Sequence, residues 1–353
     1  MIKVLELFAG IGACSKALDN LGIEHEIVDA VEIDKYAINS FNAIHGTDFE
    51  PQDIVNWDKD IECDLIMHGS PCQDFSIAGK QAGGDSGSGT RSSLMYETLR
   101  IVEKLQPKYV IWENVRNLLS KTHIHNWNSY CEKMNKLGYN NWCQIMNAKD
   151  YGVPQNRERV FTVSIRKDVN DKEFILPKPI KLTRFLRDIM EDEVDDKYFL
   201  SDEQMRNFSR SNFRSYRVFY DADGISPTLT IMSGGNREPR VAIKTANKKG
   251  YDFAKDGDGI DLCYPNSTTR RGRVGHGVAK TLATDAMQGV LDGTKIRKLT
   301  PKECWRLMGF DDDSFKKAAK VNSKTQLYKQ AGNSIVVDVL EAILKELLDG
   351  EDS

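Results

Sequence analysis

The chain has 353 residues, which is enough for one large domain or two ordinary ones. Its formal net charge is −3 and its pI is about 6.1, so a surface that binds nucleic acid has to be local. No apolar stretch approaches the roughly 20 residues of a membrane span, and the first residues lack the basic and apolar regions of a signal peptide. The seven cysteines form no CxxC pair. We therefore expect a cytoplasmic protein with reduced cysteines, no metal and no membrane partner.

Short apolar runs alternate with helical patterns over the first 166 residues. Helical periodicity follows Gly12 and Asp34 and recurs around Leu94–Leu105 and Trp127–Leu137. The runs that predict strands are Ile2–Phe8, Glu26–Val31, Asp64–His68, Tyr109–Trp112 and Val160–Ile165. This alternation predicts an α/β fold with parallel strands in a doubly wound sheet, whose ligands bind at the carboxyl ends of the strands.

The composition changes from about Glu191. The stretch up to about Asp292 is rich in Gly, Ser, Asn, Arg and Thr, which predicts a smaller, irregular, mostly β domain. Regular helix returns after Thr300, a good N-cap that forms a capping box with Glu303. The last predicted helix, Ser334–Leu348, is apolar on one face.

A glycine-rich turn, Phe8–Gly12, follows the first strand and opens a helix, where a ligand can approach the backbone. A plain tight turn would explain these glycines equally well. Glu32, at the end of the next strand, can hold the hydroxyls of a ribose, and Asp53 can meet an adenine amino group, although Asp53 also fits a helix cap or a surface acid. The turn departs from GxGxxG, which favours a nucleoside ligand without a pyrophosphate, such as S-adenosylmethionine.

Cys72 comes directly after a predicted buried strand, in the segment GSPCQDFS. That places a thiol at the edge of the sheet where chemistry occurs. The segment 79–91 holds five glycines in thirteen residues and predicts a mobile lid beside the thiol, with an ordinary flexible loop as the alternative. The other six cysteines fit small buried apolar residues.

Two further polar segments meet the predicted sheet. Glu113 and Asn114 end the strand that begins at Tyr109. In QNRER, before the next strand, Arg157 and Arg159 alternate with Glu158, so both guanidinium groups point the same way on an extended chain.

The motifs FAGIG, SPCQ, ENV, QNRER and QAGNS, in this order, resemble the signature of the DNA (cytosine-5)-methyltransferase family and span Glu6 to about Val337. The resemblance implies a Rossmann-like methyltransferase fold, S-adenosylmethionine as methyl donor and S-adenosylhomocysteine as product. It also implies a variable target-recognition region and a last helix that returns to the catalytic domain. We therefore expect a discontinuous catalytic and cofactor-binding domain, 1–192 plus 328–353, and a target-recognition domain, 193–327.

The resemblance also assigns roles in methylation of a cytosine flipped out of duplex DNA. Cys72 attacks carbon 6, Glu113 protonates ring nitrogen 3, Arg159 and Arg157 hold the base or a nearby phosphate, and Asn114 steadies the loop. The sequence does not name the base that removes the carbon-5 proton. The predicted cofactor-binding residues are Phe8, Gly10, Ile11, Gly12, Glu32, Ile33, Asp53, Ile54, Pro71, Leu94, Asn333 and Ser334.

A local basic excess marks the predicted DNA-reading region. From residue 264 to 299, seven Lys or Arg stand against two Asp, an excess of five positive charges. Arg, Asn and Ser mixed with Gly in NSTTRRGRVGH and SGGNR can pair with base edges. The predicted DNA-binding residues are Ser76, Lys80, Arg91, Arg237, Arg270, Arg271, Arg273, Thr281 and Leu282.

Three alternatives remain open: a tRNA cytosine-5 methyltransferase, a catalytically inactive DNA-binding homologue, and a nicotinamide dehydrogenase. The intact Cys72, Glu113 and Arg159 argue against inactivity, and the glycine pattern argues against a dehydrogenase. We expect a monomer that is associated with the nucleoid and acts on double-stranded DNA, with any cognate restriction endonuclease outside the complex.

Overall fold

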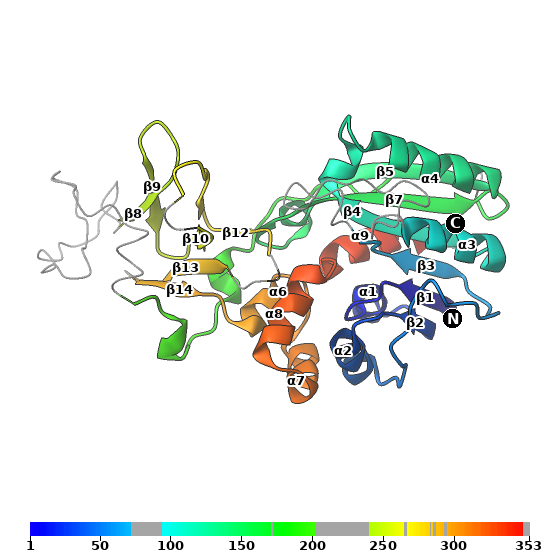
Figure 1. Cartoon of the computed structure of the whole chain (residues 1–353), viewed down its shortest axis with the longest axis horizontal. Coiled ribbons are helices and arrows are strands. Elements are labelled where there is room, and N and C mark those ends of the chain that lie inside the picture. The colour runs from blue at the N-terminus through cyan, green and yellow to red at the C-terminus, as the bar shows by residue number, and fades with distance from the viewer. Residues whose placement is uncertain are drawn as a thin grey trace, which may run out of the picture.

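The structure is a computed structural model that describes residues 1–71, 94–170, 172–201, 240–264, 267–282, 284, 287–292 and 295–348. Figure 1 shows an α/β part at one end of the long axis and a smaller β-rich part toward the other end. Helices α6, α7 and α8 lie between them in this view.

Six strands of the α/β part form one mixed sheet in the order β2-β1-β3-β4-β7-β5. β1, β2, β3 and β4 pair in parallel, whereas β7 is antiparallel to both β4 and β5. The strands are β1 (Ile2–Leu7), β2 (His25–Val31), β3 (Leu65–His68), β4 (Tyr109–Val115), β5 (Tyr139–Asn147) and β7 (Glu158–Arg166).

The expectation that every strand of this sheet is parallel is therefore wrong. The sequence did not predict β5, and β7 follows β5 after only residues 148–157. That connection is shorter than the dozen or more residues of a parallel crossover, so β5 and β7 pair as an antiparallel couple.

Helices cover both faces of the sheet. Alternating residues of β1 supply the two sides, since Val4 joins the core under α1 and α9, whereas Leu5 and Leu7 join the core under α3 and α4. α9 packs against α1, so the end of the described chain returns to the first part. The helices are α1 (Ala13–Leu21), α2 (Lys35–His45), α3 (Met95–Leu105), α4 (Ile124–Lys136) and α9 (Val337–Leu348).

The β-rich part has its own core, which includes Ile243, Ile260 and Ile296. Its main sheet has the order β11-β10-β13-β14, and β8 pairs with β9. β12 pairs with β6 of the first part and so joins the two parts. The strands are β6 (Gln155–Asn156), β8 (Arg240–Lys244), β9 (Tyr251–Lys255), β10 (Gly259–Asp261), β11 (Val274–Gly275), β12 (Ala279–Lys280), β13 (Gln288–Asp292) and β14 (Lys295–Lys298).

Three helices lead back from the β-rich part: α6 (Pro301–Arg306), α7 (Asp312–Val321) and α8 (Lys324–Asn333). The predicted capping box of Thr300 and Glu303 at α6 is confirmed. Glu303 also accepts two bonds from the fully buried guanidinium of Arg297, at 2.9 and 2.8 Å. α7 packs against α2. None of the helices in the described ranges is long and apolar enough to cross a membrane.

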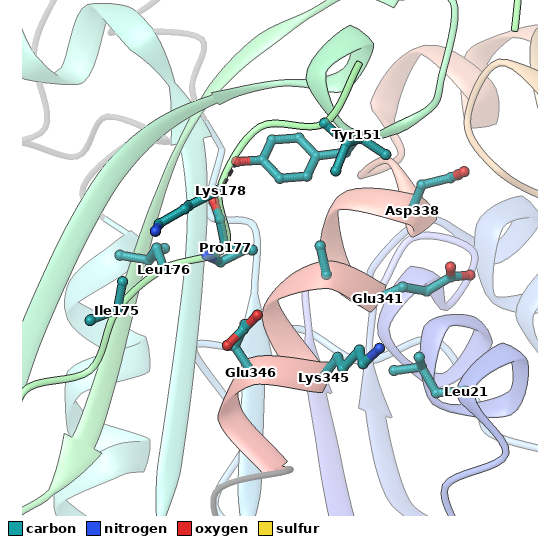
Figure 2. Close-up of a pocket in the computed structure, with 12 residues that line it drawn as sticks. Leu21, Tyr151, Ile175, Leu176, Pro177, Lys178, Asp338, Glu341, Lys345 and Glu346 are labelled. Atoms are coloured by element: carbon teal, nitrogen blue, oxygen red, sulfur yellow. Dashed lines mark hydrogen bonds between the residues drawn. The ribbon is translucent and has the colours of Figure 1, made fainter. Parts of the chain in front are cut away.

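The outward side of α9 borders a groove of about 740 Å³ (Figure 2). On the opposite wall, the hydroxyl of Tyr151 donates to the carbonyl of Pro177 at 2.9 Å, a bond drawn in Figure 2. Asp338 and Glu341 line the groove from α9. Burial, and then the charge of Glu341, raise the pKa of Asp338 to about 6. The ionised form of Asp338 is therefore unfavourable in the folded protein.

We predict that Asp338→Asn stabilises the protein at alkaline pH. A carboxyl whose pKa is higher in the folded state than in the unfolded chain binds its proton more tightly when folded. Its ionisation therefore lowers the free energy of unfolding as the pH rises through about 6. Urea unfolding at pH 8 should show a gain of about 1–2 kcal/mol, and the gain should vanish at about pH 4. Glu346→Gln, on the exposed part of α9, is the control and should stay within about 0.5 kcal/mol. An equal gain in the free energy of unfolding at both pH values would contradict the raised pKa of Asp338.

Candidate active site and cofactor cavity

A cavity opens at the carboxyl ends of β1, β3 and β4, the edge at which the sequence predicts chemistry. Five of the predicted site residues line it: Phe8, Gly10, Glu113, Asn333 and Ser334. The other lining residues are Glu6, Leu7, Ala9, Ala13, Met67, Gly69 and Ile335.

The turn after β1 is shaped by three left-handed residues, Phe8, Gly10 and Gly12, with φ of 53°, 58° and 80°. A Cβ on Gly12 would lie 2.2 Å from Nε2 of His45, so this glycine permits α1 and α2 to pack closely. A Cβ on Gly10 would meet nothing within 4 Å, so Gly10 supplies backbone conformation only. Ile11 is 1% exposed and belongs to the core, so its side chain is not available to a ligand.

Glu32 fixes the same turn from the end of β2. Its carboxylate accepts from the backbone N–H of Gly10 at 3.0 Å and of Asp34 at 2.8 Å, and burial raises its pKa. Ile33 beside it is 69% exposed. Glu32 and Ile33 do not line the cavity described above, but Glu32 determines the position of Gly10, which does.

Asp53 and Ile54 also lie outside the cavity lining. Asp53 is exposed, and its Oδ1 accepts from the N–H of Val55 at 3.0 Å, the contact of an Asx turn. Residues 54–56 form a turn and not a helix, so of the two alternatives that the sequence left open, Asp53 matches the surface acid. Ile54 is 5% exposed and packs in the core. Gln52 donates to Oδ1 of Asp29 at 2.8 Å and so anchors this segment to β2.

Glu6 is a residue of the cavity that the sequence reasoning missed. Its Oε1 accepts from the backbone N–H of Ser15 at 2.9 Å and also from the Ser15 hydroxyl. It therefore caps α1, whose N-cap residue Gly12 has no side chain to do so. Burial raises the pKa of Glu6. The signal was a lone carboxylate within the apolar strand IKVLEL.

Glu113 and Arg159 form an ion pair at this edge. Nε of Arg159 lies 3.0 Å from Oε1 of Glu113, and the two side chains are 18% and 12% exposed. They come from the antiparallel strands β4 and β7, where Val115 is the direct partner of Arg159. The sequence placed both residues in the site, and the structure brings them into contact.

The strand that leads to Cys72 is fixed by two neighbours. Nε1 of Trp112 donates to Oγ of Ser70 at 3.0 Å, and Nδ2 of Asn114 donates to the carbonyl oxygen of Ser70 at 3.3 Å. The described residues end at Pro71 on this side of Cys72 and begin again at Leu94, the N-cap of α3. The predicted site residues Cys72, Ser76, Lys80, Arg91 and Arg237 lie outside the described residues.

Arg157 is buried and connects three segments. It is 4% exposed, and its guanidinium donates to the carbonyl oxygens of Leu282 at 3.3 Å, Gly332 at 3.2 Å and Ser334 at 2.8 Å. The expectation that Arg157 holds the base or a phosphate is therefore corrected, because its donors are turned to protein carbonyls inside the molecule. Arg157 positions the cofactor-cavity residues and the loop after β12.

The predicted DNA-binding residues divide into two groups. Arg273 is 1% exposed and bonded to backbone carbonyls, so a direct DNA contact by Arg273 is wrong. The side chain of Leu282 is likewise buried, at 4% exposure. Arg270, Arg271 and Thr281 line a second cavity, of about 560 Å³. Asn156, which the sequence reasoning did not single out, lies in the same lining.

No cluster of three or more His, Cys, Asp or Glu side chains able to hold a metal ion occurs among the described residues. The cavity beside Glu113 has a volume of only about 40 Å³, which is too small for a whole nucleoside. Its lining combines an aromatic ring, a bare backbone turn and polar side chains, groups that suit one part of a nucleoside with a sulfonium group.

Comparisons with known proteins identify the family of this chain. Residues 2–349 match the family described as C-5 cytosine-specific DNA methylase. The orphan methyltransferase M.SPBetaI of Bacillus phage SPbeta is 33% identical, over 98% of this chain and 97% of its own. The type II methyltransferase M.HhaI of Haemophilus parahaemolyticus is 31% identical, over 97% and 93%.

Solved structures share the fold. A mutant of Spodoptera frugiperda DNMT2 aligns with a TM-score of 0.64 at 20% identity, over 98% of this chain and 99% of that one. A putative DNA modification methyltransferase encoded in an Escherichia coli prophage aligns with a TM-score of 0.63 at 22% identity, over the whole of both chains.

The chain therefore belongs to the C-5 cytosine-specific DNA methylase family. It is a DNA cytosine methyltransferase that uses S-adenosylmethionine, with the α/β methyltransferase fold and a smaller, mostly β region.

We predict that Arg157→Ala destabilises the fold and the cofactor cavity together. Removal of the guanidinium leaves carbonyls of Leu282, Gly332 and Ser334 without a donor, which should lower the free energy of unfolding by roughly 3 kcal/mol or more. Urea unfolding measures the first effect, and calorimetric titration with S-adenosylmethionine measures the second. Arg157→Lys keeps a donor and should be intermediate.

Arg116→Ala is the matched control, because Arg116 pairs with Glu158 on the surface with 62% of its side chain exposed. Its loss should change the free energy of unfolding by less than about 1 kcal/mol. An Arg157→Ala protein as stable as the Arg116→Ala protein would refute the connecting role.

Proposed function

We propose that the enzyme methylates carbon 5 of a cytosine flipped out of a specific duplex DNA sequence, through a covalent bond between Cys72 and carbon 6. The observation that carries this proposal is the Glu113–Arg159 pair, whose carboxylate member, Glu113, lines the same cavity as Phe8 and Asn333. Ser70, which Trp112 holds at this edge, stands two residues before Cys72 in the sequence.

Addition of a thiolate is needed because carbon 5 of cytosine is a weak nucleophile. Sulfur of Cys72 bonds to carbon 6, and the electron pair of the ring double bond becomes available at carbon 5. Sulfur is also a good leaving group, so the final elimination, with loss of the carbon-5 proton, restores the thiolate and the aromatic ring.

Glu113 supplies the proton that this addition requires. Ring nitrogen 3 gains electron density as sulfur adds, and a carboxylic acid beside it can protonate it. Arg159 contacts one carboxyl oxygen of Glu113, Oε1, and we assign the other carboxyl oxygen to the base. We propose that Arg159 binds the exocyclic oxygen of the cytosine. We propose that Asn114 helps to position Cys72, because it donates to the carbonyl oxygen of Ser70, two residues before Cys72.

When bound, S-adenosylmethionine would supply the methyl group for carbon 5, and S-adenosylhomocysteine would be the product. We assign Phe8 to stacking on its adenine, Glu32 to its ribose, with Ile33, Asp53 and Ile54 at the adenine end. The remaining predicted contacts, at the methionine end and along the turn, are Gly10, Ile11 through its backbone only, Gly12, Pro71, Leu94, Asn333 and Ser334.

DNA would approach along the β-rich part. We assign duplex contacts to Arg270, Arg271 and Thr281, and also to the predicted residues outside the described ranges. We propose domains of 1–192 plus 328–353 and of 193–327, supported by the packing of α9 on α1. The packing of α7 on α2, and the pair between Lys16 and Asp311 at 2.6 Å, support one revision of these bounds: the chain returns to the first domain at about Asp311 rather than at residue 328. We propose a monomer, with any partner endonuclease acting separately.

We predict that Cys72→Ser abolishes methylation of duplex DNA. A serine hydroxyl is a much poorer nucleophile than a thiolate at neutral pH, so transfer of label from S-adenosylmethionine to DNA should fall by at least about a thousandfold. The control is Cys143→Ser on β5, remote from the cavity, which should keep full activity.

The same assay distinguishes the substrates. Duplex DNA should accept label, whereas tRNA and a reaction without nucleic acid should not. Label in tRNA alone would establish the tRNA enzyme, and no label in any substrate would establish the inactive homologue. An active Cys72→Ser protein would overturn the covalent mechanism.

A further inference from the structure

The second cavity is lined in part by the segment that leads into Arg159. Asn156 and Thr281 line it at the junction of β6 and β12, and Arg270, Arg271, Lys280 and Gln288 line the rest. Asn156 is three residues from Arg159, the partner of Glu113. A duplex that delivers a base to Glu113 therefore brings its neighbouring base pairs close to this cavity.

Arg270 is held in a fixed direction within it. Its Nε donates to Oδ2 of Asp261 at 2.7 Å, while the other oxygen of Asp261 accepts from the N–H of Cys263 at 2.9 Å. The backbone of Arg270 is also anchored, since its carbonyl oxygen accepts from the N–H of Ala246 at 2.8 Å. The side chain is 37% exposed, and its two terminal nitrogens make no hydrogen bond to any part of the chain that the structure describes.

A second arginine, Arg273, is buried and fixes the backbone around Asp261. Arg273 donates to the carbonyl oxygens of Asp261 at 3.1 Å, Cys263 at 2.7 Å and Tyr264. It holds Tyr264 in the left-handed conformation, with φ 47°, and the exposed ring of Tyr264 lies 5.7 Å from the guanidinium of Arg270. The direction of Arg270 is thus set before any ligand arrives.

Arg270 and its neighbour Arg271 differ in whether a carboxylate neutralises their charge. Asp261 is 6% exposed and neutralises Arg270, so the pair carries no net charge and its carboxylate would repel a phosphate. A neutral base edge meets no such repulsion. Arg271 is exposed and has no carboxylate partner within the described ranges, so it keeps its full charge and suits a phosphate.

We propose that Arg270 reads a guanine of the recognised sequence, with its two terminal nitrogens on O6 and N7 in the major groove, and that Asp261 is its positioning residue. A guanidinium approached from the Nε side by a carboxylate presents its other two donors as a fork, and that fork matches the two acceptors of guanine. This inference rests on the proposed function, since it takes duplex DNA as the substrate.

The test measures kcat/KM on DNA duplexes in which single guanines are altered. Bisulfite sequencing of a plasmid methylated by the wild-type enzyme first gives the recognised sequence. Each guanine of that sequence is then replaced in turn by 7-deazaguanine, which lacks the N7 acceptor. The wild-type enzyme should lose about tenfold at one guanine.

The Arg270→Ala enzyme should be roughly ten- to a hundredfold slower on the unaltered duplex and should show no further loss at that same guanine. Asp261→Asn should retain a reduced sensitivity there, because the arginine remains but its direction is no longer set. Circular dichroism and S-adenosylmethionine binding of both variants should match the wild type.

Arg271→Ala is the matched control, since it removes the adjacent charge from the same cavity. It should weaken all duplexes evenly, keep the full loss at the deaza position, and reduce the salt slope of binding by about one. An Arg270→Ala enzyme that still shows the wild-type loss at every guanine would overturn the inference and leave the proposed function intact. A wild-type enzyme that methylates no duplex would overturn both.

Discussion

The three bonds from the Arg157 guanidinium to backbone carbonyls are the interaction on which the site depends. They connect segments that lie 125, 175 and 177 residues from Arg157 along the chain. One bears Thr281, which lines the second cavity, and the other two flank Asn333, which lines the cavity beside Glu113. Arg157 itself is two residues from Arg159. A buried cation without such partners would be strongly destabilising, so the burial of Arg157 favours this mutual arrangement of the three segments.

The direction of β7 explains why the Glu113–Arg159 pair can form. In a parallel sheet the carboxyl ends of the strands share one edge, and the beginning of each strand lies at the other. Because β7 is antiparallel to β4, its first residues lie at the edge where β4 ends. Arg159 at the start of β7 therefore reaches Glu113 near the end of β4. If β7 were parallel to β4, QNRER would lie at the opposite edge of the sheet, away from the cavity beside Glu113.

Local sequence predicted the parts of the site that depend on local geometry. Phe8 and Gly10 follow a strand, and Glu113 ends one, so strand positions alone place them at one edge. The burial of Arg157 was not predictable in this way, since its acceptors lie 125 to 177 residues away along the chain. Arg273 bonds to carbonyl oxygens only 9 to 12 residues before it, but the positions of those carbonyls depend on how the β-rich part folds. Strand β5 was missed because YNNWCQIMN is partly exposed and polar, and only its pairing with β7 makes it a strand.

The most direct measurement of the central claim, that Cys72 bonds to the target base, is mass spectrometry of the enzyme after incubation with S-adenosylmethionine and a cognate duplex carrying 5-fluorocytosine at the target position. Fluorine at carbon 5 blocks the final elimination, so the covalent adduct should accumulate. The account predicts one stable adduct per enzyme, on the peptide that contains Cys72. An adduct on another cysteine, or none on a duplex whose unfluorinated form is methylated, would contradict it.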